Sequence, residues 1–86
     1  MWKIIYTKRA ITDAKKIAKI GLKDKTQHLL EIIGNNPFHM PPPYEKLVNL
    51  KNTYSRRIDI RHRLVYEVIK EEKLIIVRLM YKHYGD

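Results

Sequence analysis

All four prolines of this chain lie between residues 37 and 43, and this segment restricts the possible folds more than any other feature. Proline lacks a backbone N–H donor and is excluded from helix interiors and central strands, so the segment is predicted to be a semi-rigid loop. Helical patterns precede it and strand patterns follow it. Because the chain has only 86 residues, we expect one domain over residues 1–86 with a modest core.

The residues before the proline segment predict one strand and two helices. Trp2 to Tyr6 is rich in aromatic and β-branched residues, which indicates a strand. Thr7 can cap a helix in which Ala and Ile recur at helical spacing, with lysines opposite, until Gly21 ends it. A second helix is predicted from about Asp24 to Ile33, because the Gly-Asn-Asn-Pro sequence that follows is a stop signal.

The residues after the proline segment predict four strands. We expect short strands near Lys46 to Leu50 and from Tyr54 to Ile60, followed by an antiparallel hairpin of Arg63 to Ile69 with Leu74 to Tyr81. A strand, two helices and then several strands is an α+β order. It predicts helices gathered on one face of a mostly antiparallel, twisted sheet of about five strands.

The charge of the chain points to a polyanionic partner. There are 18 Lys and Arg against 9 Asp and Glu, a net charge of +9, which favours nucleic acid as the partner class. Hydrophobic residues at 44% and charged residues at 31% are typical of globular domains and argue against disorder. Between residues 46 and 63 the acid is Asp59, and the basic residues are Lys46, Lys51, Arg56, Arg57, Arg61 and Arg63.

Several classes of site and location are disfavoured. The chain has no cysteine, so it offers neither disulfides nor thiolate ligands, and this fits the reducing cytoplasm. The four histidines are scattered, with no pair at helical i, i+4 spacing beside a carboxylate, so no metal site is expected. No cofactor-binding motif is present, and no apolar run approaches the roughly 20 residues of a membrane span.

Alternation along the predicted strands brings two arginines to one face of the sheet. Ser55, Arg57 and Asp59 share a face opposite to the hydrophobic one, and Arg63 in the next strand can project from the same open face. Two neighbouring guanidinium groups repel each other unless an anion joins them. A phosphate would satisfy both, because its oxygens match the planar donors of arginine.

Four short sequence motifs resemble those of a known family: Glu45-x-Leu47, Tyr54-Ser55-Arg56-Arg57-Ile58, His62-Arg63-Leu64-Val65-Tyr66 and the terminal His83-Tyr84. With these motifs the sequence resembles the YoeB/Txe toxins of bacterial toxin–antitoxin pairs, within the RelE superfamily. The likeness spans almost the whole chain, including the order of the elements. The helical half is similar in pattern only.

The resemblance implies a ribosome-dependent endoribonuclease that cuts messenger RNA in the A site. It implies an acidic antitoxin of the YefM/Phd type as partner, and a homodimer is one assembly that it allows. By position, Glu45 matches the general base, Arg63 the arginine that steadies the phosphate, and His83 with Tyr84 the pair linked to leaving-group protonation and base stacking. The residues expected to bind RNA are Lys46, Lys51, Arg56, Arg57 and Arg61.

The same chemistry can be argued from the residues without a metal. RNA carries its own nucleophile, so the protein needs only to remove the 2′-hydroxyl proton and protonate the leaving 5′-oxygen. A carboxylate and an imidazole suffice, with arginine stabilising the charge that develops on the phosphate. The expected products are a 2′,3′-cyclic phosphate and a 5′-hydroxyl.

Other interpretations of these residues remain open at this stage. Glu45 can be a solvated side chain, Arg63 can simply pair with Glu67 or Asp59, and His83 can be a surface histidine. A first rival function is that of a superfamily member that binds a partner protein, as gyrase-poisoning toxins do, without cutting RNA. A second is a plain RNA-binding module whose basic sheet holds phosphates without chemistry.

Overall fold

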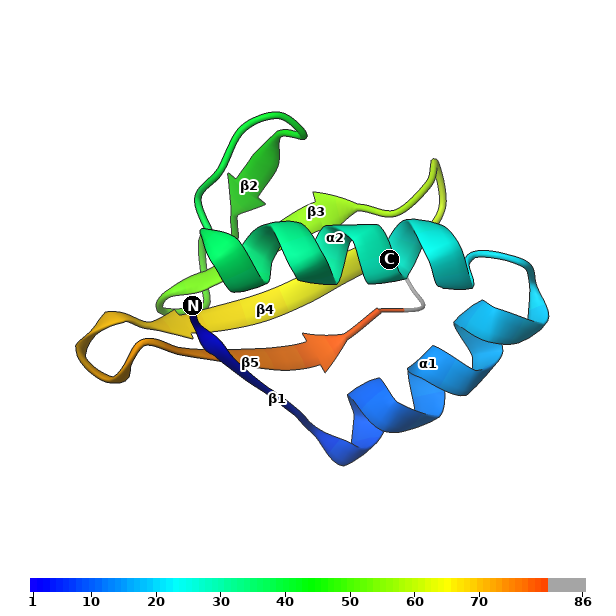
Figure 1. Cartoon of the computed structure of the whole chain (residues 1–86), viewed down its shortest axis with the longest axis horizontal. Helices are drawn as coiled ribbons and strands as arrows, with labels where there is room; N and C mark the ends of the chain where they lie inside the picture. Colours follow the sequence, from blue (N-terminus) through cyan, green and yellow to red (C-terminus); the bar gives the residue numbers. More distant parts are fainter. Residues whose placement is uncertain (81–86) are drawn as a thin grey trace.

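A computed structural model describes residues 1–80 of the protein and has the predicted α+β order (Figure 1). The elements are β1 (Lys3–Tyr6), α1 (Lys8–Lys19), α2 (Lys23–Asn35), β2 (Tyr44–Lys46), β3 (Thr53–Arg57), β4 (Arg63–Ile69), the 3-10 helix η1 (Lys70–Glu72) and β5 (Leu74–Leu79). The proline segment forms the loop between α2 and β2, as expected.

The five strands form one sheet in the order β1-β5-β4-β3-β2. Strand β1 pairs with β5 in parallel, and every other pair is antiparallel, which confirms the mostly antiparallel sheet. The predicted hairpin of β4 and β5 is confirmed, with Ile69 opposite Leu74 at the turn. This order makes β2 the edge strand beside β3, so the residues between positions 44 and 65 are brought together at one edge of the sheet.

The helix boundaries follow the predicted signals with one exception. Thr7 accepts a hydrogen bond from the Ala10 N–H at 3.1 Å, which caps α1, and Gly21 takes the positive φ of 80° that follows the end of this helix. Helix α2 continues through Gly34, which was predicted to stop it. A Cβ at Gly34 would meet the Ile4 side chain at 3.4 Å, so this glycine serves close packing against β1.

Two strand boundaries were predicted wrongly. The strand expected near 46–50 lies instead at Tyr44–Lys46, and the chain turns directly after it, where the Leu47 N–H donates to Thr53 O at 2.9 Å. The strand expected to reach residue 60 ends at Arg57, because Asp59 accepts the backbone N–H groups of the two residues that follow Ile60 and so forms a turn. Residue 81, the predicted end of the last strand, lies outside the described residues.

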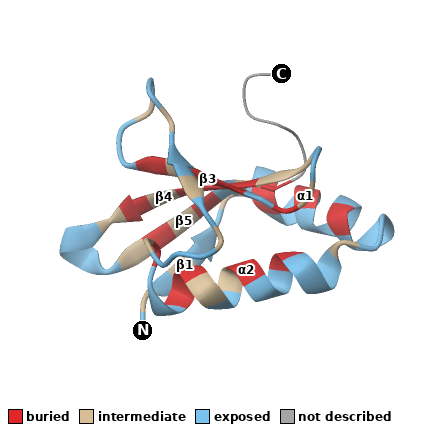
Figure 2. Ribbon diagram, turned by 90° about the horizontal axis from the view of Figure 1, so that it is seen from above, coloured by how far each residue is buried: buried red, intermediate tan, exposed pale blue. Residues whose placement is uncertain are grey.

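Helix α2 runs along one face of the sheet (Figure 2), and the hydrophobic core contains residues of both helices and of β4 and β5. The strand residues of this core are Leu64, Tyr66, Val68, Ile75 and Val77, and the helices contribute Ala10, Ile17, Leu29 and Ile33. Helix α1 packs against β5, β1 and α2. None of the helices within residues 1–80 is long and apolar enough to cross a membrane.

The side chain of Arg56 is fully buried and binds the proline segment. Its terminal nitrogens donate to the carbonyl oxygens of Pro42 at 2.6 Å, His39 at 2.8 Å and Pro37 at 3.1 Å. Its Nε donates to the hydroxyl of Tyr66 at 3.0 Å, and this hydroxyl donates to the Pro37 carbonyl at 2.9 Å. The prediction that Arg56 binds RNA is therefore wrong, because a guanidinium buried among these acceptors cannot reach a ligand.

We predict that Arg56→Met lowers the free energy of unfolding by about 3 kcal/mol or more, because it leaves several buried carbonyl groups without a donor. Urea unfolding followed by circular dichroism measures this change. The matched control is Arg57→Met at the next position, whose exposed side chain should alter stability by only about 0.5 kcal/mol. Equal losses in the two variants would contradict the structural role of Arg56.

Candidate functional site

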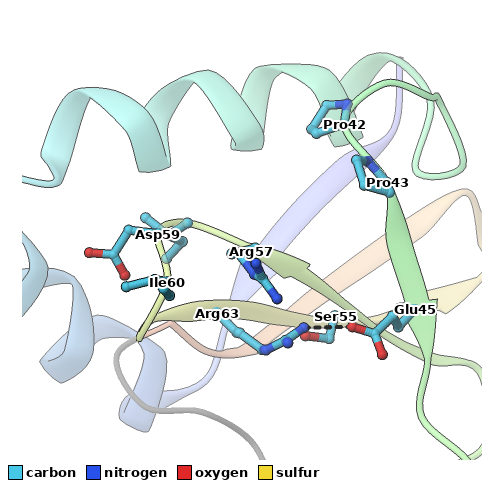
Figure 3. A pocket seen from close by; sticks show the side chains of 9 residues that line it. Pro42, Pro43, Glu45, Ser55, Arg57, Asp59, Ile60 and Arg63 are labelled. Carbon is cyan, nitrogen blue, oxygen red and sulfur yellow. Dashed lines mark hydrogen bonds and ion pairs between the residues drawn. The ribbon is translucent and has the colours of Figure 1, made fainter.

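A groove of about 510 Å³ opens on the sheet face that α2 does not cover (Figure 3). The proline segment, the edge strand β2, the central strands β3 and β4 and the turn between these two strands form its walls. Its lining residues are Pro42, Pro43, Glu45, Ser55, Arg57, Ile58, Asp59, Ile60 and Arg63. Three of the sequence-predicted site residues, Glu45, Arg57 and Arg63, are therefore brought together in one groove.

The groove contains an ion pair that reaches across the sheet from β2 to β4. The Nη1 of Arg63 donates to Oε1 of Glu45 at 2.8 Å, shown by the dashed line in Figure 3. The Arg63 side chain is 17% exposed, whereas that of Glu45 is 68% exposed. Of the possible partners considered for Arg63, Glu67 instead pairs with Arg78. An ion pair this open to water contributes little stability, so a ligand can displace it at low cost.

A second guanidinium lies directly across from the first. Arg57 in β3 is the register partner of Arg63 in β4, and its side chain makes no hydrogen bond or ion pair with the described residues. Like charges that face each other across a strand pair are destabilising. A phosphate between the two side chains would relieve this repulsion and engage the donors of both.

Asp59 lines the groove and pairs with His62, which is not one of the lining residues. The Nδ1 of His62 lies 2.8 Å from Oδ1 of Asp59, and the same oxygen accepts the backbone N–H groups of Arg61 and His62. Burial raises the pKa of Asp59, but the hydrogen bond of the His62 side chain, with those of the two backbone donors, outweighs it. The pKa of Asp59 therefore lies below its usual value. Its Oδ1 is already engaged by the hydrogen bonds of the turn.

The remaining predicted RNA-binding residues lie outside the groove. Lys46 follows Glu45 in β2 and pairs with Tyr54, so it belongs to the other face of the sheet. Lys51 lines a separate hollow of about 430 Å³ beside Glu67. Arg61 is exposed in the turn between β3 and β4. RNA binding by Lys46, Lys51 and Arg61 stays a prediction.

The other two predicted catalytic residues, His83 and Tyr84, lie outside the described residues. Within residues 1–80, no group of three or more His, Asp and Glu side chains could hold a metal ion. The groove itself offers a solvent-open carboxylate and two guanidinium groups. Such a set can bind a phosphate group and take up a proton from a hydroxyl beside it.

Ser55 was not among the predicted site residues, yet it lies among the charged residues that line the groove. Its side chain is 1% exposed, and its hydroxyl has no hydrogen-bond partner among the described residues. Strand alternation had already placed Ser55 on the face of Arg57. A serine in a strand is common, however, and only the missing partner distinguishes this one.

Comparison with known proteins identifies relatives over nearly the whole length. A family model described as "ParE toxin of type II toxin-antitoxin system, parDE" matches residues 4–83. No curated protein matches the sequence. The fold is similar to that of a YoeB/ParE toxin from Agrobacterium tumefaciens, with a TM-score of 0.85 and 25% identity, covering 95% of this chain and 99% of that chain.

Structures of YoeB from Staphylococcus aureus are more similar in sequence. The YoeB dimer is 32% identical, with a TM-score of 0.82, and the match covers 96% of this chain and 98% of that chain. The YoeB–YefM complex is also 32% identical, with a TM-score of 0.79, covering 98% of this chain and 99% of that chain.

The lowered pKa of Asp59 predicts how stability depends on pH. A carboxyl whose pKa is lower in the folded state stabilises the fold above its unfolded pKa of about 3.9, and this stabilisation is lost as the pH falls through the folded pKa. We therefore expect Asp59→Asn to be less stable than the native chain at pH 6, with the difference shrinking below about pH 4. Urea unfolding across this range measures it. A difference that stays the same at pH 3 would contradict the assignment.

Proposed function

We propose that this chain, which belongs to the ParE/RelE superfamily of toxins from type II toxin–antitoxin systems, is a metal-independent endoribonuclease that cleaves messenger RNA in the ribosomal A site. The observation that carries the proposal is the contact of Glu45 Oε1 with Arg63 Nη1 at 2.8 Å, beside the guanidinium of Arg57, which has no partner within residues 1–80. A general base and two phosphate-binding groups thus share one groove.

The first step is binding of the scissile phosphate by the two arginines. Arg57 has no partner within the described residues, and the partner of Arg63 is a solvent-exposed carboxylate. The phosphate therefore draws Arg63 away from Glu45 and takes its donors. This exchange leaves Glu45 in the groove without its cation, beside the ribose that follows the phosphate into the site.

In the chemical step Glu45 takes the proton from the 2′-hydroxyl. The 2′-oxygen forms a bond to phosphorus, the bond from phosphorus to the 5′-oxygen breaks, and a proton passes to that 5′-oxygen. Arg63 stabilises the negative charge that develops on the phosphate oxygens, a contribution commonly worth about 3 kcal/mol per donor. The products are a 2′,3′-cyclic phosphate and a 5′-hydroxyl.

The proton donor is proposed to be His83, with Tyr84 stacking on a base, and both residues lie outside the described part of the chain. The support for these roles is that His83 and Tyr84 match the C-terminal His-Tyr motif of the YoeB toxins. An imidazole with an ordinary pKa of about 6.5 exchanges protons readily near neutral pH. Lys46, Lys51 and Arg61 are proposed to hold the backbone of the RNA or of the ribosome.

The cognate partner is proposed to be an acidic antitoxin of the YefM/Phd type that covers the groove. YoeB of S. aureus, at 32% identity, has been crystallised in complex with YefM and also as a dimer. A net charge of +9 favours an acidic and partly disordered segment as the covering partner. We propose a cytoplasmic complex of this kind, with the homodimer as the form without antitoxin.

Glu45→Gln and Arg63→Met should each reduce cleavage by about a hundredfold or more, because one lacks the base and the other the phosphate donor. Primer extension on a translated message measures cleavage. Glu67→Gln is a matched control, since Glu67 also pairs with an arginine but lies in the separate hollow, and it should cleave like the native chain. A 2′-deoxy residue at the cut site should block cleavage, because it lacks the attacking hydroxyl.

Cleavage that survives Glu45→Gln unchanged would contradict the proposed base. A native chain that arrests growth without cutting any translated message would point instead to the partner-binding mode of the superfamily. Inhibition of gyrase supercoiling is the assay for that alternative. A chain that binds RNA but neither cuts it nor inhibits gyrase would be a plain RNA-binding module.

His83→Gln provides a test of the sequence-derived acid. The amide cannot donate a proton to the leaving oxygen, so cleavage should fall by about a hundredfold or more. Binding to a 2′-deoxy substrate analogue on the ribosome should stay within about twofold of the native chain, because the phosphate-binding arginines are untouched. Native cleavage by this variant would remove His83 from the mechanism.

A further inference from the structure

Only two buried side-chain polar atoms within residues 1–80 have no hydrogen-bond partner, Oγ of Ser55 and Oγ1 of Thr26. Buried hydroxyl groups nearly always find a partner, so each exception calls for an explanation. Thr26 lines a hollow between the two helices, remote from the groove. Ser55 instead lines the groove itself, on the central strand β3.

The sheet register identifies the partner that the Ser55 hydroxyl can reach. Its neighbours on the same face are Glu45 in β2 and Val65 in β4. Val65 offers no acceptor on its side chain, whereas Glu45 offers a carboxylate. In an antiparallel pair the Cβ atoms of opposite residues are about 5 Å apart, which lets a serine hydroxyl meet a glutamate carboxylate after a rotamer change.

The present contacts of Glu45 explain why this hydrogen bond is not formed. Oε1 of Glu45 accepts from Arg63, and Oε2 has no donor within residues 1–80. Figure 3 shows Ser55 beside the line that joins the two charged groups. Arg63 thus holds the carboxylate, while the buried Ser55 hydroxyl in the neighbouring strand has no acceptor among the described residues.

We propose that Ser55 is a positioning residue for Glu45: when Arg63 leaves Glu45 for an anionic ligand, the Ser55 hydroxyl donates a hydrogen bond to the carboxylate. The catalytic meaning of this exchange depends on the function proposed above, but the exchange itself does not. A donor on a central strand keeps the carboxylate in the groove at the moment when its other partner is removed. It also favours the ionised form that a general base requires.

An NMR titration tests the exchange without any RNA. Arg63→Met reproduces the state in which the guanidinium has left Glu45, and carbon-detected NMR follows the carboxyl group of Glu45. Adding Ser55→Ala in this background should move the titration midpoint of Glu45 up by about 0.5 pH. The other charged groups lining the groove, Arg57 and Asp59, are the same in both proteins.

Two comparisons make this titration specific. With Arg63 present, Ser55→Ala should move the midpoint much less, because the arginine already holds the carboxylate. Adding Thr26→Val to the Arg63→Met chain removes the other unpartnered hydroxyl and should leave the midpoint in place. Identical midpoints for Arg63→Met with and without Ser55→Ala would overturn the proposal.

Cleavage kinetics supply the second readout. Ser55→Ala should lower kcat by about tenfold with KM within about twofold, and the acid limb of the pH–rate profile should move to higher pH. Ser55→Thr, which keeps a hydroxyl, should restore both, and Thr26→Val should behave like the native chain. A loss of kcat with an unmoved pH profile would indicate a merely structural role and overturn the proposal.

The two experiments separate two kinds of failure. If the native chain cleaves no RNA, the proposed ribonuclease function fails, and the NMR titration still decides whether Ser55 holds Glu45. If the native chain cleaves RNA and the titration shows no effect of Ser55→Ala, the ribonuclease function is supported and the positioning role of Ser55 is contradicted.

Discussion

The geometry of the groove depends on the hydrogen bonds that the buried guanidinium of Arg56 donates to the proline segment. This guanidinium donates to three carbonyl oxygens of the segment between α2 and β2, a segment whose prolines cannot join a helix or the sheet by backbone hydrogen bonds. It also lies 5.1 Å from the ring centroid of Tyr44, its register partner in β2. Because Glu45 directly follows Tyr44, a side chain on the hidden face of the sheet determines where the carboxylate on the open face stands.

Arg56 and Arg57 are adjacent in β3, and strand alternation places their side chains on opposite faces of the sheet. The Arg56 side chain points to the core side, where the Tyr66 hydroxyl and three carbonyl groups accept four hydrogen bonds from it. Burial raises the pKa of the Tyr66 phenol, so it remains a neutral donor. The Arg57 side chain points to the open face, opposite Arg63, with no partner within the described residues. The same residue type thus serves stability at one position and ligand binding at the next.

Much of the fold follows from local patterns. The Thr7 cap, the Gly21 stop, the proline loop and the hairpin of β4 and β5 were all predicted, and each depends on residues close together in the chain. The errors arise where distant contacts outweigh local signals. Helix α2 continues through Gly34, where the Ile4 side chain of β1 packs closely against it. Arg56 is buried because it binds carbonyl groups that lie 14 to 19 residues earlier in the chain, which no local pattern indicates.

The sequence by itself determined the α+β order, the basic charge, and the face of the sheet on which Arg57 and Arg63 meet, because helical and strand periods are written into neighbouring residues. Only the tertiary structure decided that Glu45 reaches Arg63 across β3 and that the Ser55 hydroxyl has no hydrogen-bond partner within residues 1–80. The physical reason is that strand register and loop placement are set by packing and hydrogen bonds between segments far apart in the chain, and no local pattern contains them.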